Sequence, residues 1–297
     1  MGALDGKVAI VTGAGRGIGR GEALLLASEG ARVVVNDLGT AREGTGSDAS
    51  AAEQVVAEIK GGGGEAVANR DDVSSWDGAK ALVDQAVETF GDLNILVNNA
   101  GILRDKMSFN TDESDWDAVI KVHLKGHFAP SHHASVYWRG RAKEGQDTSG
   151  RIINTSSEAG LFGNVGQANY SAAKGGIYSL TLTLARELKR FNVTANAIAP
   201  RARTRMTEDI FGAAPDGFDE LAPDNVAPVV GWLASDAAAA VSGQVFFIMG
   251  GQLRVLAPFL TAGSVSKDGR WTVEELIKAQ DELFTSHPSK PPRFGVA

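Results

Sequence analysis

Residues 7–19 read KVAIVTGAGRGIG, a short apolar run followed by a turn that contains four glycines. Residues 7–12 predict a strand, and the residues that follow the turn, up to Ser28, predict a helix. A strand, a glycine-rich turn and a helix make the first half of a dinucleotide-binding unit, in which the helix N-terminus faces the pyrophosphate. The residues expected to contact the cofactor here are Gly13, Arg16, Gly17, Ile18 and Gly19.

An acidic residue follows the next predicted strand. Residues 32–36, RVVVN, end at Asp37, about 20 residues past the glycine turn. A carboxylate at that position accepts a hydrogen bond from the ribose 2′-hydroxyl and repels a 2′-phosphate. The sequence therefore predicts NAD as the cofactor, although Arg16 in the glycine turn could reach a 2′-phosphate.

Strands and helices alternate along the rest of the chain. Alternation of this kind predicts an α/β fold with a Rossmann-type, doubly wound sheet of seven parallel strands and helices on both faces. We expect residues 1–251 to form one NAD-binding catalytic domain. Residues 252–297 should form a C-terminal extension, with a helix over 272–284, packed on the same domain or on a neighbouring subunit. The remaining strands are expected at 65–69, 93–97, 151–155, 193–199 and 244–249.

Polar residues and glycines stand just after several predicted strands, which is where doubly wound sheets bind their ligands. Residues 98–101 read Asn-Asn-Ala-Gly after the fourth strand, and Pro200 follows the sixth. The irregular segment 201–224 then predicts a lid over the site. The cofactor is expected to contact Asp72, Val73, Asn99, Ala100, Gly101, Pro200 and Thr204.

A phenol and an amine stand four residues apart in the predicted helix 167–189. This spacing puts the side chains of Tyr170 and Lys174 on one face of a helix. A free phenol has a pKa of about 10, and a neighbouring cation lowers that pKa by favouring the phenolate. Such a pair can exchange a proton with an alcohol or a carbonyl near neutral pH. Ser157, thirteen residues before Tyr170, could bring a hydroxyl to the same place.

Composition and charge narrow the class of protein. Of the 297 residues, 43% are hydrophobic and 22% are charged, as in ordinary globular proteins. The net charge of -7 argues against nucleic acid or an anionic membrane surface as a partner. The chain contains no cysteine, which excludes disulfides and fits a reducing compartment. With no apolar run near the roughly 18 residues of a membrane span and no visible signal peptide, we expect a cytoplasmic protein.

Four histidines fall in the predicted helical region 112–137, and two pairs of them have helical spacing. They are His123, His127, His132 and His133. No carboxylate-rich helical metal motif accompanies them, so we expect no metal site.

Taken together, these motifs resemble the short-chain dehydrogenase/reductase family over roughly residues 4–251. The resemblance rests on the glycine turn, on Asp72-Val73, on Asn98-Asn99-Ala100-Gly101, and on the interval between Ser157 and Tyr170-x-x-x-Lys174. It implies hydride transfer between a nicotinamide and an alcohol or ketone. By the same resemblance, Tyr170 is the acid/base, Lys174 lowers its pKa and binds the nicotinamide ribose, and Ser157 hydrogen-bonds the reacting oxygen.

Two positions depart from the family pattern. The family usually has an asparagine where this chain has His123, in the run His-Leu-Lys-Gly. A packing histidine is the simplest interpretation there. The family usually has Pro-Gly after the sixth strand, and this chain has Pro200-Arg201.

Four other segments resemble one branch of that family. Residues 33–39, 101–105, 122–126 and 163–170 look like the (3R)-hydroxyacyl-CoA dehydrogenase domains of multifunctional enzyme type 2, also called the 17β-hydroxysteroid dehydrogenase type 4 group. The resemblance implies an NAD-dependent enzyme that acts on a fatty or steroid-derived 3-hydroxyacyl-CoA. Apolar residues of the lid and of the tail could bury the acyl group, and Arg104 and Lys106 could lie near the coenzyme A end. These apolar residues are Met206, Ile210, Phe211, Phe218, Phe259, Leu260, Trp271 and Leu276.

Three alternative functions stay open at this stage. The first is a 3-oxoacyl carrier-protein reductase, which usually uses NADPH and is therefore disfavoured by Asp37. The second is a hydroxysteroid dehydrogenase for free steroids. The third is a non-catalytic NAD-binding sensor, which would not need the set Ser157, Tyr170 and Lys174.

The two long predicted helices, 112–137 and 167–189, carry apolar residues on more than one face. The family resemblance implies a homo-oligomer, a tetramer or a dimer, and these helices support it because they need cover beyond one sheet.

Overall fold

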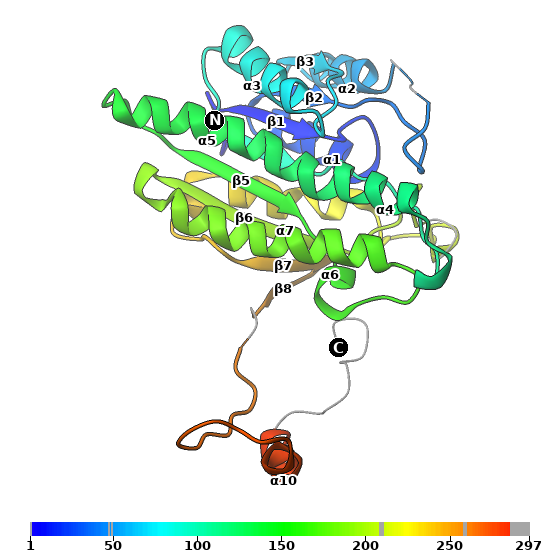
Figure 1. Cartoon of the computed structure of the whole chain (residues 1–297). Helices are drawn as coiled ribbons and strands as arrows, with labels where there is room; N and C mark the ends of the chain where they lie inside the picture. The colour runs from blue at the N-terminus through cyan, green and yellow to red at the C-terminus, as the bar shows by residue number, and fades with distance from the viewer. Residues whose placement is uncertain (1, 47, 49, 208–210, 258–259, 286–297) are drawn as a thin grey trace.

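The computed structural model describes residues 2–46, 48, 50–207, 211–257 and 260–285. Its centre is one eight-stranded sheet in the order β3-β2-β1-β4-β5-β6-β7-β8 (Figure 1). The first seven strands run parallel and β8 runs antiparallel to β7. The strands are β1 Val8–Thr12, β2 Arg32–Asn36, β3 Ala66–Asn69, β4 Ile95–Asn98, β5 Gly150–Thr155, β6 Val193–Pro200, β7 Val245–Met249 and β8 Gln252–Leu256.

The prediction of a doubly wound α/β sheet is confirmed, but the expected number of seven strands is wrong. The eighth strand comes from the start of the C-terminal extension. Gly250 adopts a positive φ of 53° between β7 and β8, and the chain turns back on itself there. Met249 then pairs with Gln252, and Val245 pairs with Leu256. A two-residue turn with glycine in the left-handed region is a common hairpin connection.

Helices cover both faces of the sheet, and each face has its own apolar core. Ala9, Val11 and Val33 face α1, α2 and α9, whereas Val8 and Ile10 face α3, α5 and α7. Because both faces are buried, the strands read as continuous apolar runs instead of alternating ones. The helices are α1 Gly17–Ser28, α2 Ser50–Gly61, α3 Trp76–Phe90, α4 Glu113–Ile120, α5 Gly126–Lys143, α6 Glu158–Phe162, α7 Ala168–Glu187, α9 Ala227–Ala234 and α10 Val273–Leu283.

The helical region expected at 112–137 is interrupted and also longer than expected. A π-helical turn, Lys121–Lys125, separates α4 from α5. The predicted end of the helical region at Tyr137 is wrong, since α5 continues to Lys143. Trp138 belongs to this last part of α5. Its side chain is buried, and its indole N–H donates to the Leu93 carbonyl at 2.6 Å. Burial of this one large side chain stabilises the helix in a stretch whose other residues are mostly polar.

The C-terminal extension leaves the sheet after β8. Residues 260–271 form neither helix nor strand, and α10 stands away from the sheet and its helices (Figure 1). Val273, Leu276, Ile277 and Phe284 on or next to α10 are all exposed. Two residues expected in the substrate wall, Ile210 and Phe259, lie outside the described residues. None of the helices described here is long and apolar enough to cross a membrane.

Candidate active site

A cavity of roughly 800 Å³ lies at the carboxyl ends of the parallel strands, and we call it the strand-end cavity. It brings together every predicted site residue except Gly19. Gly19 is buried and has a packing role, because a Cβ there would lie 2.4 Å from the Gly13 carbonyl oxygen and 2.5 Å from Asn99 Nδ2. The residues brought together are Gly13, Arg16, Gly17, Ile18, Asp37, Asp72, Val73, Asn99, Ala100, Gly101, Ser157, Tyr170, Lys174, Pro200 and Thr204.

The glycine turn and the turn after β4 are tied to each other. The Thr12 hydroxyl accepts hydrogen bonds from the backbone N–H groups of Asn99, at 2.9 Å, and Ala100, at 3.1 Å. The Asn99 side chain donates to the carbonyls of Thr12 and Gly13. Gly13 has a φ of 62°, and a Cβ on it would lie 2.8 Å from the Ala100 backbone. The two turns therefore form one rigid rim, next to the N-terminus of α1.

Asp37 is held by the backbone at one end of the cavity. Its two carboxylate oxygens accept hydrogen bonds from Gly15 N–H at 2.7 Å and Gly39 N–H at 2.6 Å. Each oxygen keeps a second lone pair that can accept a further hydrogen bond. Nearby, Arg16 forms an ion pair with Asp48 at 2.6 Å. Arg16, the cation that could have favoured a 2′-phosphate, is thus paired with the Asp48 carboxylate.

The other strand ends contribute side chains in fixed positions. Asp72 accepts hydrogen bonds from the Ser74 N–H and hydroxyl, and it lies 3.6 Å from Lys121. Those hydrogen bonds and Lys121 outweigh the effect of burial and hold the pKa of Asp72 below its usual value. Thr204, after β6, lies next to Gly17 across the cavity.

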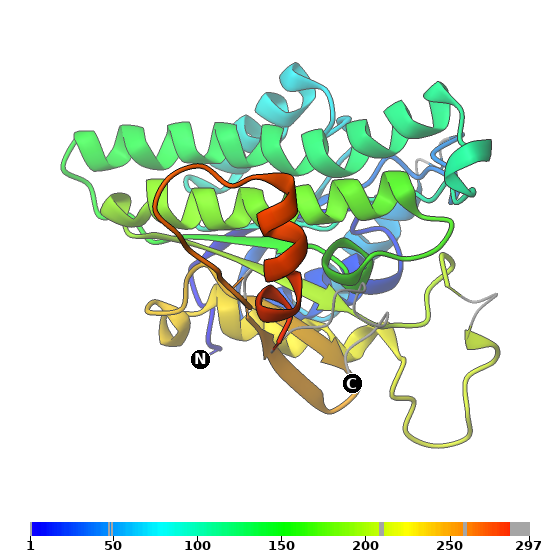
Figure 2. The ribbon, with the colours of Figure 1, turned by 60° about the horizontal axis from the view of Figure 1, so that its bottom comes forward.

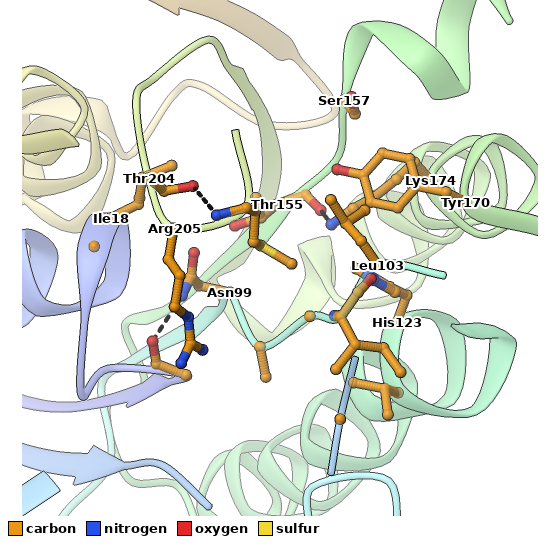
Figure 3. Close-up of a pocket in the computed structure, with 18 of the residues that line it drawn as sticks. Ile18, Asn99, Leu103, His123, Thr155, Ser157, Tyr170, Lys174, Thr204 and Arg205 are labelled. Atoms are coloured by element: carbon orange, nitrogen blue, oxygen red, sulfur yellow. Dashed lines mark hydrogen bonds between the residues drawn. The ribbon is translucent and has the colours of Figure 1, made fainter. Parts of the chain in front are cut away.

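Tyr170 and Lys174 lie side by side on α7 (Figure 3). The Lys174 Nζ donates to the Thr155 carbonyl at 2.6 Å and lies 5.5 Å from the centre of the Tyr170 ring. Burial raises the pKa of Tyr170 to about 12. Ser157 lowers this pKa, and the charge of Asp105 raises it by a smaller amount. Burial also lowers the pKa of Lys174 to about 7.

The sequence predicted that Lys174 lowers the pKa of Tyr170. In the structure burial raises that pKa, and Ser157 is the residue that lowers it. The reason is that both side chains are enclosed by protein, which disfavours the phenolate and the ammonium alike.

Ser157 lines the strand-end cavity together with Tyr170. Its hydroxyl accepts a hydrogen bond from Ala159 N–H at 3.2 Å and caps α6, and it lowers the pKa of Tyr170 against the effect of burial. The neighbouring Ser156 is buried and donates its hydroxyl to the Lys174 carbonyl at 2.9 Å. The hydroxyls of the two neighbouring serines therefore have different partners.

His123 also touches the acid/base pair, from the π-helical turn. Its Nε2 lies 2.7 Å from the Ile102 carbonyl oxygen and 3.0 Å from the Ile102 N. Its ring stands edge-on to Tyr170 with 5.1 Å between ring centres. Burial lowers the pKa of His123 to about 3, so the ring is neutral at ordinary pH. Its replacement of the family asparagine was the only sequence signal for this contact.

His127, His132 and His133 do not line the cavity. His127 is fully buried, and burial together with the charge of Lys174 holds its pKa well below the usual value. The rings of His132 and His133 lie against Trp76 in tilted and edge-on arrangements, with ring centres 4.6 and 4.9 Å apart. Within the described residues, no group of three or more His, Cys, Asp or Glu side chains is placed to hold a metal ion.

Several further residues of the cavity were not predicted as site residues. Gln167 donates to Asp105 at 2.7 Å, and Asn164 donates to Gln167 at 2.9 Å. Burial raises the pKa of Asp105. Glu158 and Arg201 form a doubly hydrogen-bonded ion pair. These side chains come from loops and from the start of α6, and no local pattern encodes their folded positions.

Comparison with known proteins identifies the family. The model of the short chain dehydrogenase family matches residues 7–213. The chain is 49% identical over 288 residues to the hydroxyacyl-CoA dehydrogenase ChsB1 of Mycobacterium tuberculosis, covering 95% of this chain and 89% of that one. It is 44% identical to mouse peroxisomal multifunctional enzyme type 2, covering 97% of this chain and 38% of the longer protein.

The fold has a close counterpart among solved structures. A short chain dehydrogenase from Mycobacterium avium superposes with a TM-score of 0.90 at 51% identity, covering 99% of this chain and 100% of that one. The chain therefore belongs to the short chain dehydrogenase family and is an oxidoreductase acting on CH–OH groups.

Proposed function

We propose that this protein interconverts a (3R)-hydroxyacyl-CoA, fatty or steroid-derived, and the corresponding 3-oxoacyl-CoA with NAD. The observation that supports the chemistry is the presence of Ser157, Tyr170 and Lys174 together in the strand-end cavity, with Lys174 beside the Tyr170 ring. The substrate class follows from relatives that are named hydroxyacyl-CoA dehydrogenases and multifunctional enzymes.

The residues of the cavity fit a dinucleotide. The Gly13 backbone approaches the Ala100 backbone so closely that a side chain is excluded, which leaves an open cradle at the N-terminus of α1. In the proposed complex this cradle holds the pyrophosphate. Asp37 holds the adenosine ribose, and Asp72-Val73 lies against the adenine. Residues 99–101, Lys174, Pro200 and Thr204 surround the nicotinamide half. NAD, when bound, supplies the hydride acceptor and a positive charge.

Tyr170 carries the proton in the proposed reaction. In the oxidative direction its phenolate takes the proton of the substrate hydroxyl, while the C3–H bond breaks and its electron pair leaves as hydride. Ser157 hydrogen-bonds the same oxygen and keeps it beside the phenol. Lys174, fixed by the Thr155 carbonyl, holds the nicotinamide ribose and, when protonated, favours the phenolate. In the reductive direction the Tyr170 phenol returns the proton.

The wall for the acyl group comes in part from the lid. Met206 and Phe211 line the strand-end cavity, whereas Phe218 is 69% exposed and points away from it. Figure 2 shows the segment 211–222 as an open loop beside the sheet. Arg104 and Lys106, the basic residues expected near coenzyme A, both pair with Asp115. These two cations therefore do not support the substrate assignment, which follows from the named relatives and is compatible with the apolar wall.

We propose the cytoplasm as the location, because a chain without cysteine fits a reducing compartment. Subcellular fractionation that recovered the protein in another compartment would contradict this.

The substrate assignment predicts stereospecific oxidation of a thioester. With NAD, absorbance at 340 nm should rise with (3R)-hydroxyacyl-CoA of medium or long chain, and much less with the (3S) isomer or with a short free alcohol. A free 17β-hydroxysteroid serves as the comparison. Activity restricted to the (3S) thioester or to the free steroid would overturn the assignment.

Replacing Tyr170 by phenylalanine removes the reacting proton and keeps the ring. We expect kcat to fall about 10²-fold or more, because general acid/base catalysis is typically worth 10²–10⁴-fold. NAD binding, measured by fluorescence titration, should persist. Tyr178→Phe on the same helix is the matched control, since Tyr178 is buried outside the cavity. A rate above about a tenth of wild type for Tyr170→Phe would refute the role.

Cofactor choice should depend on the charge of Asp37. The wild type is expected to prefer NAD. Asp37→Asn, which keeps an oxygen to accept a backbone hydrogen bond, should improve kcat/KM for NADP relative to NAD by roughly fivefold or more. One unit of charge at about 4 Å from a phosphate is worth at least about 1 kcal/mol. Asp84→Asn, at a half-buried position of α3 that does not line the cavity, is the control. A wild type that uses NADP as well as NAD would count against the proposal.

The exposed apolar side of α10 predicts assembly. We propose that residues 252–297 pack in part on a second copy of the chain in a dimer or tetramer, because an amphipathic helix needs cover for its apolar side. Light scattering should give a multiple of 31.0 kDa. The double variant Leu276→Glu with Ile277→Glu should lower that mass, and Lys278→Gln on the same helix should not. A monomer at micromolar concentration would contradict assembly.

A further inference from the structure

An ion pair joins the residue after Ser157 to the segment after β6. Arg201 donates from Nε to Glu158 Oε2 at 2.9 Å and from Nη2 to Glu158 Oε1 at 2.6 Å. Glu158 is buried, and the carboxylate is therefore largely shielded from water. Two parallel hydrogen bonds between a guanidinium and a carboxylate fix distance and orientation together. A pair in this geometry can set the position of the backbone on either side of it.

On one side, the pair controls the start of α6. Glu158 is the first residue of this five-residue helix, and Ser157 is its N-cap. The Ser157 hydroxyl accepts a hydrogen bond from Ala159 N–H, so its orientation depends on where the first turn of α6 lies. A Cβ on Gly160 would lie 2.5 Å from the backbone of Lys174 and Gly175. The short helix thus packs directly on the part of α7 that carries the acid/base pair.

On the other side, the pair is anchored to the sheet. The Arg201 N–H donates to the Ile248 carbonyl at 2.9 Å and continues the pairing of β6 with β7. Its guanidinium lies over the Phe247 ring at 5.3 Å from the ring centre. Phe247 is fully buried in β7, so Arg201 has a rigid support. Arg201 therefore fixes the position of Glu158 relative to the central sheet.

We propose that Glu158 and Arg201 are positioning residues, which fix the start of α6 and so orient the Ser157 hydroxyl in the cavity that it shares with Tyr170. Neither residue need touch the reacting atoms for this role. The inference depends on the dehydrogenase chemistry of the family and on the proposed role of Tyr170, and it is independent of which alcohol is the substrate.

The role has a consequence for proton transfer. Tyr170 faces Ser157, Lys174, Asp105 and the neutral His123 ring. Of these, Ser157 is the group that lowers the phenol pKa against the effect of burial. If Ser157 loses its orientation, the pKa of Tyr170 rises. Oxidation needs the phenolate, so the rise of kcat with pH then moves to higher pH.

Arg201→Lys is the test variant, since lysine keeps the charge and loses the planar fork. We expect the oxidative kcat profile to move up by about one pH unit, which corresponds to about tenfold lower kcat at pH 7. The KM for NAD should change little. Ser157→Ala should shift the profile in the same direction. In the Ser157→Ala background, Arg201→Lys should add no further shift, because two residues that act through one contact are not additive.

Matched controls separate positioning from loss of structure. Arg203→Lys changes an arginine two residues away that pairs with Asp219 and does not line the cavity, and it should leave the pH profile in place. If Arg201→Lys proves unstable, Glu158→Gln with Arg201→Gln keeps two hydrogen-bonding amides without net charge and should restore part of the wild-type profile.

An equal shift caused by Arg201→Lys in the wild-type and Ser157→Ala backgrounds would overturn the proposal. A fall in melting temperature with an unchanged pH profile would do the same. The assay uses whichever alcohol the wild type oxidises. Failure with (3R)-hydroxyacyl-CoA would therefore count against the proposed substrate and not against this pair.

Discussion

The hydrogen bonds between the glycine turn and the turn after β4 are the constraint on which the site depends. The sheet order places β1 beside β4, although β2 and β3 lie between them in the chain. At this switch in strand order the two turns meet, and the Thr12 hydroxyl and Asn99 side chain lock them together. Ligands bind in doubly wound sheets at such a position. The cavity then opens between the rim made by these turns and the segments after β5 and β6.

Burial is the second factor that shapes the site. The same enclosure raises the pKa of Tyr170 and lowers the pKa of Lys174 and His123. The protein side chains alone therefore keep the phenol protonated at neutral pH, with Ser157 opposing this. A site of this kind needs its few polar contacts in fixed places, since each has a large effect where water is scarce.

The two departures from the family pattern both lie next to the acid/base pair. His123 packs its ring on Gly101, where a Cβ would approach to 2.4 Å, and stands edge-on to Tyr170. Arg201 forms the ion pair beside Ser157. A histidine in place of an asparagine and an arginine in place of a glycine are thus not surface variation. Each connects the residues that carry the proposed chemistry to a neighbouring turn or strand.

The sequence by itself determined the fold class, the glycine turn, Asp37 and the membership of Ser157, Tyr170 and Lys174 in one cavity. These depend on local features: apolar periodicity, glycine spacing, and a four-residue interval on one helix. Only the tertiary structure decided that β8 pairs with β7, that α5 continues past Trp138, and that burial sets the pKa of Tyr170. It also decided that Arg201 pairs with Glu158 and that Gly19 packs against the rim without lining the cavity. These outcomes depend on contacts between residues far apart in the chain, and no local pattern encodes such contacts.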